Sequence, residues 1–248
     1  MPAQAVSFDP LARNFDRWHQ LIGGPLKDYL QGELHDHAER AVDLGCGSGQ
    51  HASLLASRYR HVLAVDISEP MLEIAHAHHD LPNITYQRRD LRELHPDTDG
   101  TFNLVFSAYA LHHVPDLDQT LWRLRQLCAP WGRVVLVDNV APTPAVPRRW
   151  FVQEALRTLT LDLLRHRRPV PEAWELFNLS TNPAWLDHLT SDRFLTPEEF
   201  AERYGQVFPG ARFTDLYRAR AMYWEEGSPV SSIVSAASSG HPHDLLNR

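Results

Sequence analysis

The sequence predicts an α/β fold, in which one domain is built around a doubly wound, mostly parallel sheet of seven strands. Three observations support this prediction. Short apolar runs alternate with helical patterns from residue 40 to residue 138. The runs at 104–106 and 134–137 are apolar throughout, as expected for parallel strands that are covered on both faces. A turn rich in glycine directly follows the first strand, and it lets backbone N–H groups reach a ligand.

The composition of the chain argues against several classes of binding partner. The chain has 248 residues, of which 43% are hydrophobic and 22% charged, and this suits one domain with a sizeable core. A net charge of −7 leaves no basic field for a nucleic-acid backbone. The two cysteines, Cys46 and Cys128, indicate no disulfide framework, so we expect a cytoplasmic location. No signal-peptide pattern and no apolar run near the ~20 residues of a membrane span are found. We expect a monomer or homodimer without nucleic-acid or membrane partners.

Residues 1–224 are expected to form a single domain that opens with a helical leader at 8–34. In this leader Leu11, Phe15 and Trp18 recur at spacings of three and four, which places them on one helix face. Within the core at 40–138, strands are predicted at 40–44, 61–65, 83–87, 102–106 and 133–137, and helices at 48–58, 69–79 and 117–128.

Two of these helices carry recognisable end signals. Ser68 is a good N-cap for the helix at 69–79. Pro70 falls in the first turn of that helix, where its missing N–H costs nothing. Pro130 and Gly132 follow the last predicted helix of the core and are expected to end it before the fifth strand.

The alternation of strands and helices stops after residue 138. Three prolines at 141–147 indicate a linker, and a helical pattern without strands follows it. We interpret 141–195 as a helical insertion over the edge of the sheet. Thr196 begins a further helix with a capping-box pattern. The closing segment at 196–224 is predicted to add strands at 212–216 and 220–224, and the tail at 225–248 to be disordered.

The glycine-rich turn raises the question of which ligand it binds. Gly45, Gly47 and Gly49 follow the pattern G-x-G-x-G. A dinucleotide fingerprint needs G-x-G-x-x-G, and Gln50 stands at its third glycine position. The Gly-Lys-Ser/Thr of a phosphate-binding P-loop is absent from the turn. Asp66 closes the second strand and suits the hydroxyls of a ribose, which both dinucleotides and other nucleoside cofactors carry.

Four stretches, in order and with family-like spacing, resemble the motifs of class I S-adenosylmethionine-dependent methyltransferases. They read "VDLGCGSG", "VDISEPML", "RRDLREL" and "FSAYALHHVPD". They are most similar to the small-molecule branch, which includes quinone and natural-product methyltransferases. The resemblance covers about 8–138 and 194–224. It implies transfer of a methyl group from S-adenosylmethionine to a small, aromatic or hydrophobic acceptor, at oxygen, nitrogen or carbon, in secondary metabolism.

The resemblance implies contacts to the methionine part of the cofactor. The three glycines would lie against this part, and Asp43 would orient the loop and, through water, the ammonium group. Ser107 and Ala108, at the end of the fourth strand, would lie beside the sulfonium. The leader would close over the cofactor and bring Phe15 and Arg13 to it. The family often has tyrosine near Phe15, so this chain keeps the packing there without the hydroxyl.

The resemblance also implies contacts to the nucleoside part. Asp66 would bind the ribose diol, and Ile67 and Met71 would enclose the adenine by apolar contact. Asp90 would accept a hydrogen bond from the adenine amino group, while the backbone N–H of Leu91 would donate to the ring. Two alternatives remain open at this stage. Asp90 would equally serve as the cap of a short helix, and Met71 would equally serve to fill the core.

The loop after the fourth strand supplies the candidate catalytic residues. His112 and His113 would lie at the carboxyl end of the sheet, and a neutral imidazole suits proton removal near neutral pH. Of the two we favour His112 as the base. Tyr109 would face the acceptor. The alternative is structural: such histidines also hold a loop in place by hydrogen bonds, and Tyr109 would then be a packing residue.

No metal site is predicted. His76, His78 and His79 are close in sequence, but their spacing on a helix keeps them from facing one direction. We interpret them as a solvated surface. The tryptophans of the insertion, with Trp18 of the leader, are expected either to pack in the core or to wall an apolar acceptor pocket.

Three other functions stay in view. The chain could be a methyltransferase-fold enzyme that binds the cofactor but catalyses another reaction, such as a cyclisation. It could be a binding protein that kept only the fold. An NAD-dependent dehydrogenase is a third reading, which the residue at position 50 and the stretch at 107–116 disfavour.

Overall fold

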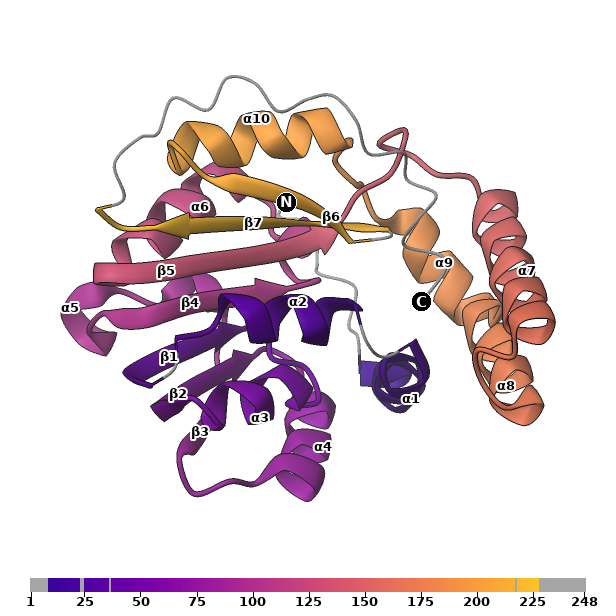
Figure 1. Ribbon diagram of the computed structural model, residues 1–248, viewed down its shortest axis with the longest axis horizontal. Coiled ribbons are helices and arrows are strands. Elements are labelled where there is room, and N and C mark those ends of the chain that lie inside the picture. Colours follow the sequence, from indigo (N-terminus) through magenta and orange to yellow (C-terminus); the bar gives the residue numbers. More distant parts are fainter. Residues whose placement is uncertain (1–8, 23–24, 36, 217, 228–248) are drawn as a thin grey trace.

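The computed structural model describes residues 9–22, 25–35, 37–216 and 218–227, and it contains the predicted sheet of seven strands (Figure 1). Most of the predicted tail, at 228–248, lies outside the described residues. The strands are β1 (Ala38–Leu44), β2 (Tyr59–Asp66), β3 (Ile84–Arg88), β4 (Phe102–Ala108), β5 (Cys128–Asn139), β6 (Arg212–Leu216) and β7 (Ala219–Glu225).

The order of the strands across the sheet is β3-β2-β1-β4-β5-β7-β6. Strands β1 to β5 pair in parallel, and β7 runs antiparallel between β5 and β6. The chain moves outward from β1 to β3 and then returns to the other side of β1 with β4. The predicted doubly wound, mostly parallel sheet is therefore confirmed.

Helices cover both faces of the sheet. One core forms where α2, α3 and α4 pack on the sheet, and a second forms where α6 and α10 pack on the opposite face. The α-helices are α1 (Ala12–Ile22), α2 (Pro25–Glu33), α3 (Gln50–Ala56), α4 (Glu69–His79), α5 (Pro96–Asp99), α6 (Leu117–Gln126), α7 (Arg148–Arg165), α8 (Val170–Ser180), α9 (Pro183–Ser191) and α10 (Pro197–Val207). The 3₁₀ helices are η1 (Asp9–Leu11), η2 (Leu91–Glu93) and η3 (Leu111–His113). Among the described residues, no helix has the length and the apolar character needed to span a membrane.

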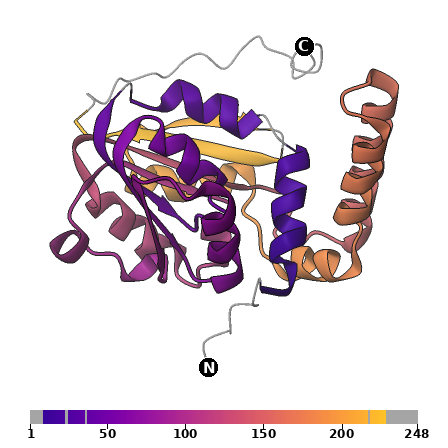
Figure 2. The same cartoon turned by 90° about the horizontal axis from the view of Figure 1, so that it is seen from below.

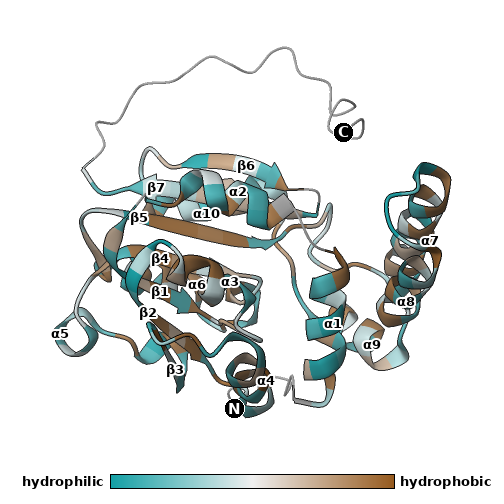
Figure 3. Ribbon diagram, turned by 60° about the horizontal axis from the view of Figure 1, so that its bottom comes forward, coloured by the Kyte–Doolittle hydropathy of each residue, from teal (hydrophilic) through white to brown (hydrophobic). Residues whose placement is uncertain are grey.

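Burial alternates along the strands because successive side chains point to opposite faces. On β1, Ala41 belongs to the core under α2 and α3, while Val42 and Leu44 belong to the core under α6 and α10. Strand β5 is hydrophobic along most of its length (Figure 3). Full burial of each such Val or Leu contributes about 1.5–3 kcal/mol, so both helix layers hold the sheet in place.

The predicted insertion consists of α7, α8 and α9, which lie beyond the carboxyl ends of β4 and β5 (Figures 1 and 2). It has a small core of its own, made by Ala141, Val146, Phe151, Leu186 and Phe194. Helix α1 stands between the insertion and the edge of the sheet (Figure 2). The insertion and α1 together face the loops at which parallel strands present their ligand sites.

Strand β5 differs from its prediction. We expected the preceding helix to reach Cys128 and a turn to follow it, but α6 ends at Gln126 and β5 begins at Cys128. The pairing with β4 shifts register after Phe102, and Trp131 has a φ of 62°. Residues 129–132 therefore form an irregularity within the strand, which absorbs the proline and glycine that the sequence places there.

Candidate functional site

The candidate site lies where the strand order reverses. Strand β1 sits between β2 and β4, and Leu44 pairs with Ser107 at the carboxyl ends of β1 and β4. The glycine loop after β1 and the histidine loop after β4 are therefore neighbours. Open α/β sheets bind ligands in the crevice at such a reversal.

The three glycines adopt positive φ angles, 73° at Gly45, 52° at Gly47 and 82° at Gly49. They differ in what a side chain would meet. A Cβ at Gly45 would lie 2.4 Å from the Cβ of Ala110, and one at Gly49 would lie 2.6 Å from the hydroxyl of Tyr86. A Cβ at Gly47 would meet nothing within 4 Å. Space for a ligand thus lies at Gly47, while packing explains the other two glycines.

Two acids lie beside the glycine loop. Asp43 is buried, and its Oδ2 has no hydrogen-bond partner. Burial and the charge of Asp66 raise the pKa of Asp43 to about 8. Asp66, at the end of β2, accepts hydrogen bonds from the backbone N–H groups of Gly47 at 2.8 Å and Ser68 at 2.9 Å. A positively charged ligand group would relieve the cost of burying Asp43.

The residues expected around the adenine differ in exposure. Ile67 is 59% exposed at the end of β2, whereas Met71 is only 3% exposed. Asp90 caps η2 by accepting from the backbone N–H of Arg92, and it also pairs with the guanidinium of Arg92 at 2.5 Å. That hydrogen-bonded pair holds the pKa of the Asp90 carboxyl below its usual range. Leu91 packs against the second core. Both alternatives that the sequence left open, a cap at Asp90 and a core position for Met71, are therefore present.

The end of β4 is buried. Ser107 has no exposed surface, and its hydroxyl donates a hydrogen bond to the backbone oxygen of Leu44 at 2.8 Å. Ala108 is also buried. Tyr109, the next residue, has a φ of 58°, which is uncommon for a residue with a side chain. Its backbone N–H donates to the oxygen of Val137 on β5. Strain of this kind is often retained where a site needs a fixed geometry.

Helix α1 contributes aromatic side chains above this edge. The ring of Phe15 lies 5.7 Å from that of Trp185 on α9 and 4.4 Å from that of His19. Trp18 lies 5.9 Å from Trp185, and His19 lies 5.5 Å from Tyr109. The leader, the insertion and the loop after β4 therefore meet in one aromatic cluster. Arg13, which the family resemblance also brought to the cofactor, is exposed on α1.

Two half-buried histidines in this region were not anticipated from the sequence. His19 on α1 and His51 on α3 have ring centres 6.3 Å apart, and His51 lies 5.4 Å from Phe106. Burial lowers the pKa of His19 to about 3 and that of His51 to about 4, so both are neutral at neutral pH. Their helical patterns gave no signal, because each is one polar residue among several in an ordinary helix.

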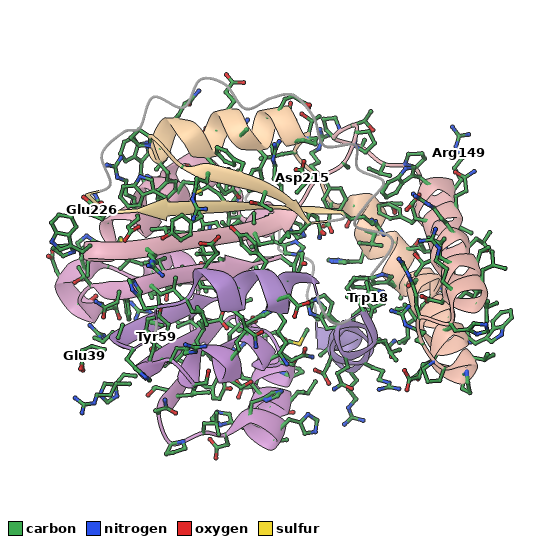
Figure 4. All side chains as sticks on the ribbon, in the orientation of Figure 1. Trp18, Glu39, Tyr59, Arg149, Asp215 and Glu226 are labelled. Carbon is green, nitrogen blue, oxygen red and sulfur yellow. The ribbon has the colours of Figure 1, made fainter. Side chains whose placement is uncertain are left out.

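Polar contacts attach α1 to its neighbours. Asp16 accepts a hydrogen bond from the side chain of Gln50 at 3.2 Å, which links α1 to the start of α3. Arg17 donates two hydrogen bonds to Glu175 on α8, at 2.8 and 2.7 Å. Trp18 reaches from α1 toward the insertion (Figure 4), where its indole N–H donates to Ser180 at 3.0 Å. Helix α1 is therefore fixed both to the start of α3, directly after the glycine loop, and to the insertion.

The histidine loop is held by an acid from the neighbouring strand. Asp138, near the end of β5, accepts a hydrogen bond from the backbone N–H of His112 at 2.8 Å, and its other oxygen lies 2.5 Å from Nδ1 of His112. Burial alone would lower the pKa of His112, but the charges of Asp138 and Asp192 outweigh it and raise this pKa. Burial lowers the pKa of His113. The sequence pattern could have revealed Asp138, because it is an acid at the end of an apolar strand.

The insertion adds a second acid and a third histidine to this cluster. Asp192, at the end of α9, lies 3.8 Å from Nε2 of His112 and 3.7 Å from Nδ1 of His113. His188, one turn earlier, lies 3.5 Å from Asp192. Both residues were missed, because a lone acid four residues after a histidine is common on helices. The predicted catalytic residues Tyr109, His112 and His113 do come together at one edge of the sheet.

Known proteins resemble part of the chain. Residues 41–132 match the family model of a methyltransferase domain. The trans-aconitate 2-methyltransferase of Deinococcus radiodurans is 36% identical over 125 residues, which are 48% of this chain and 46% of that protein. The demethylmenaquinone methyltransferase of Clavibacter sepedonicus is 29% identical over 167 residues, which are 66% of each chain. The chain thus spans about half to two thirds of the length of these relatives.

Solved structures share the fold at low sequence identity. The DhpI–SAH complex has a TM-score of 0.59 at 19% identity, over 89% of this chain and 94% of that one. An S-adenosylmethionine-dependent methyltransferase from Mesorhizobium loti has a TM-score of 0.56 at 21% identity, over 83% of this chain and all of that one. The sheet order, the domain match and these folds agree with the family that the four sequence motifs predicted. Residues 41–132 thus match a methyltransferase domain, and the described fold is that of the class I S-adenosylmethionine-dependent methyltransferases.

Proposed function

We propose that the protein transfers a methyl group from S-adenosylmethionine to a small, aromatic or hydrophobic organic acceptor. One observation carries this proposal, namely an open glycine position between two acids. Gly47 leaves space for a ligand, the buried Asp43 has an oxygen without a partner, and Asp66 binds the loop from the end of β2. The names of two relatives, for trans-aconitate and for demethylmenaquinone, refer to small-molecule acceptors.

In this proposal the chain holds the cofactor with its two acids and an apolar surface. The cofactor, when bound, supplies a methyl group already activated for displacement from sulfur. Asp43 faces its positively charged groups, and Asp66 accepts charge-assisted hydrogen bonds from the ribose. Ile67 offers an exposed apolar side chain to the adenine. The proposed wall of this site also includes Phe15, Gly45, Gly49, Met71, Asp90, Leu91, Ser107 and Ala108.

The acceptor would lie under the aromatic cluster. Phe15, Trp18 and Trp185 approach one another within about the range of favourable ring contacts, at 5.7 to 6.4 Å between centres. Tyr109 closes the cluster from the sheet through its contact with His19. Rings arranged in this way exclude water from a methyl transfer and align a flat acceptor. They favour an apolar or aromatic acceptor over a protein or nucleic acid.

His112 would present a lone pair at the acceptor side. Because Nδ1 lies against Asp138, a neutral His112 carries its proton on Nδ1 and its lone pair on Nε2. This orientation supports the role that the sequence suggested, in which His112 assists the acceptor with His113 and Tyr109 beside it. The change His112→Ala should keep cofactor binding and lose methyl transfer. Normal turnover would remove His112 from the catalytic residues.

The substitution Asp66→Ala tests the cofactor site. Loss of a charge-assisted acceptor should weaken binding of S-adenosylmethionine by roughly 1–3 kcal/mol, or about 5- to 150-fold. Calorimetric titration measures this affinity, and circular dichroism checks the fold. Asp97→Ala removes an exposed carboxylate elsewhere and should leave the affinity unchanged. Equal affinities of wild type and the Asp66 variant would contradict the ribose assignment.

A further inference from the structure

Three side chains from two distant parts of the chain bring possible metal-ligand atoms together. His112 and His113 come from η3, after β4, and Asp192 follows α9 in the insertion. One nitrogen from each histidine and one oxygen from Asp192 lie within 4.8 Å of one another. The contacts to the carboxylate are 3.8 Å from Nε2 of His112 and 3.7 Å from Nδ1 of His113.

These separations do not correspond to hydrogen bonds, which join nitrogen and oxygen at about 2.7–3.2 Å. They are close to the edges of a metal coordination shell. The ligand atoms of a tetrahedral ion with bonds of ~2.0–2.1 Å lie about 3.4 Å apart. A contraction of a few tenths of an ångström would bring each histidine nitrogen to that distance from its own oxygen of Asp192, which is Oδ2 for His112 and Oδ1 for His113.

The carboxylate of Asp192 points to the same conclusion. Its side chain is only 9% exposed, and its Oδ2 makes no hydrogen bond. A desolvated carboxylate oxygen without a partner is costly. Nε2 of His112 lies 3.8 Å from this oxygen, and Nε2 of His188 lies 3.5 Å from it. A cation among these atoms would satisfy the oxygen and use the nitrogen lone pairs at once.

The orientation of His112 matches that of a metal ligand. Asp138 binds Nδ1 of His112 at 2.5 Å and its backbone N–H at 2.8 Å, and also accepts from the backbone N–H of Asn139. The opposite nitrogen, Nε2, faces Asp192. A carboxylate behind a ligating imidazole fixes the ring and its tautomer in many metal sites. Here the supporting acid lies on β5, whereas the histidine lies on η3 after β4.

We propose that His112, His113 and Asp192 bind one divalent transition-metal ion of the Zn²⁺ class, with His188 beside the carboxylate of Asp192. Two imidazoles and one carboxylate favour such an ion over Mg²⁺ or Ca²⁺, which prefer oxygen ligands alone. The ion ties the insertion to the core. Only its further role, at the acceptor side of the site, rests on the proposed function. A bound ion uses the lone pair on Nε2, so His112 is then a ligand and not the base.

Zinc binding by the untagged, full-length protein tests this site. The protein is stripped with a chelator and dialysed against Zn²⁺, and the bound metal is counted by elemental analysis. We expect the wild-type protein to bind one Zn²⁺ per chain. In the Asp192→Asn protein we expect the apparent affinity for Zn²⁺ to be at least about tenfold lower, so that this ion is lost. Asp187→Asn changes an exposed acid on the same helix, which pairs with Arg148, and should keep the ion.

A second ligand variant and a Co²⁺ spectrum give independent tests of the same metal site. Zinc bound at another place, for example by His241 and His243, would remain in the Asp192→Asn protein. The difference in zinc content between the wild type and this variant therefore counts only the proposed site. If that variant does not fold, His113→Ala replaces it, because the side chain of His113 is partly exposed. Substitution of Co²⁺ for Zn²⁺ should give a visible absorption spectrum typical of a four- or five-coordinate site, and the variants should lack it.

Equal zinc content in wild type and in the ligand variants would overturn the inference. Titration with S-adenosylmethionine on the same samples separates this result from a failure of the proposed function. Protein that binds the cofactor but no zinc contradicts the metal site alone. Protein that binds zinc at Asp192 but no cofactor contradicts the proposed function alone.

Discussion

Burial decides the roles of individual residues at this site. Asp66 could be picked from the sequence, because an acid that closes an apolar strand marks the ligand edge of a parallel sheet. Asp43 could be picked because it stands two residues before the first glycine of the motif. The exposure of individual side chains could not be predicted from the sequence in the same way. Ile67 and Met71 were expected as a pair, yet Ile67 is exposed and Met71 is in the core. The carboxylate of Asp90 accepts a hydrogen bond from the backbone N–H of Arg92, two residues away. This contact forms only because residues 91–93 fold into η2.

The pKa of Asp43 predicts a pH dependence of cofactor binding. This pKa is raised to about 8, so the acid is protonated in the free protein at pH 7. A cationic ligand favours the ionised form, so binding should release up to one proton at pH 7. The affinity should therefore rise with pH and level off above about pH 8. Calorimetry in buffers of different ionisation enthalpy counts the protons.

The variant Asp43→Asn is the control for this effect. It should bind S-adenosylmethionine more weakly at high pH and release no proton from this position. The same proton count in the variant as in the wild type would assign the release to another group.

The three glycines should respond differently to alanine. At Gly47 a methyl group meets open space, so Gly47→Ala costs only the strain of its positive φ, about 1–2 kcal/mol. It should, however, block the cofactor. At Gly45 the methyl group would strike Ala110 at 2.4 Å, so Gly45→Ala should destabilise the fold more. Urea unfolding and cofactor titration measure the two effects, and a larger loss of stability at Gly47 would be the contrary result.

Elements with clear end signals were predicted closely, and those shaped by tertiary contacts were not. The helix at 69–79 has its predicted bounds because Ser68 accepts from the backbone N–H of Met71 and proline follows in the first turn. The start of β5 was misplaced. Pro130 and Gly132 are turn residues by local chemistry, yet pairing with β4 extends the strand back to Cys128. Local pattern alone cannot reveal such pairing.

The attachment of α1 gives a prediction at this scale. Arg17 and Glu175 are partly exposed, so breaking their pair should change overall stability by less than about 1 kcal/mol. Arg17→Gln should nevertheless speed hydrogen exchange in α1, because the helix then loses a contact to α8. Mass spectrometry of peptides from 12–22 measures this exchange. Arg148→Gln breaks a pair within the insertion and should leave α1 unchanged, and unchanged exchange in both variants would mean that the pair does not hold α1.

The whole molecule assembles its site from segments that are far apart in the chain. The glycine loop, the histidine loop and the insertion meet because the strand order reverses at β1. The sequence predicted the sheet and both loops from their motifs. The sequence marks Asp138 as an acid at the end of an apolar strand, but it could not predict that Asp138 and Asp192 face His112, since long stretches of chain separate these residues. Packing of the insertion against the core makes that cluster.

Cofactor binding should stabilise the entire fold, because the ligand binds only the folded state. At a free concentration of ~100 times its dissociation constant, S-adenosylmethionine should add about 2.7 kcal/mol to the free energy of unfolding. For a chain of this size that corresponds to a rise in Tm of roughly 5–10 °C. Differential scanning fluorimetry measures the shift. The Asp66→Ala protein at the same concentration should show a smaller rise, and equal shifts would place the ligand elsewhere.

The most direct measurement is a calorimetric titration of the wild-type protein with S-adenosylmethionine and, separately, with NADH. The open position at Gly47, the acid at the end of β2 and Gln50 in place of a third glycine lead us to expect one site for S-adenosylmethionine and no binding of NADH. Binding of NADH alone, or of neither ligand, would contradict a methyltransferase cofactor site in this fold.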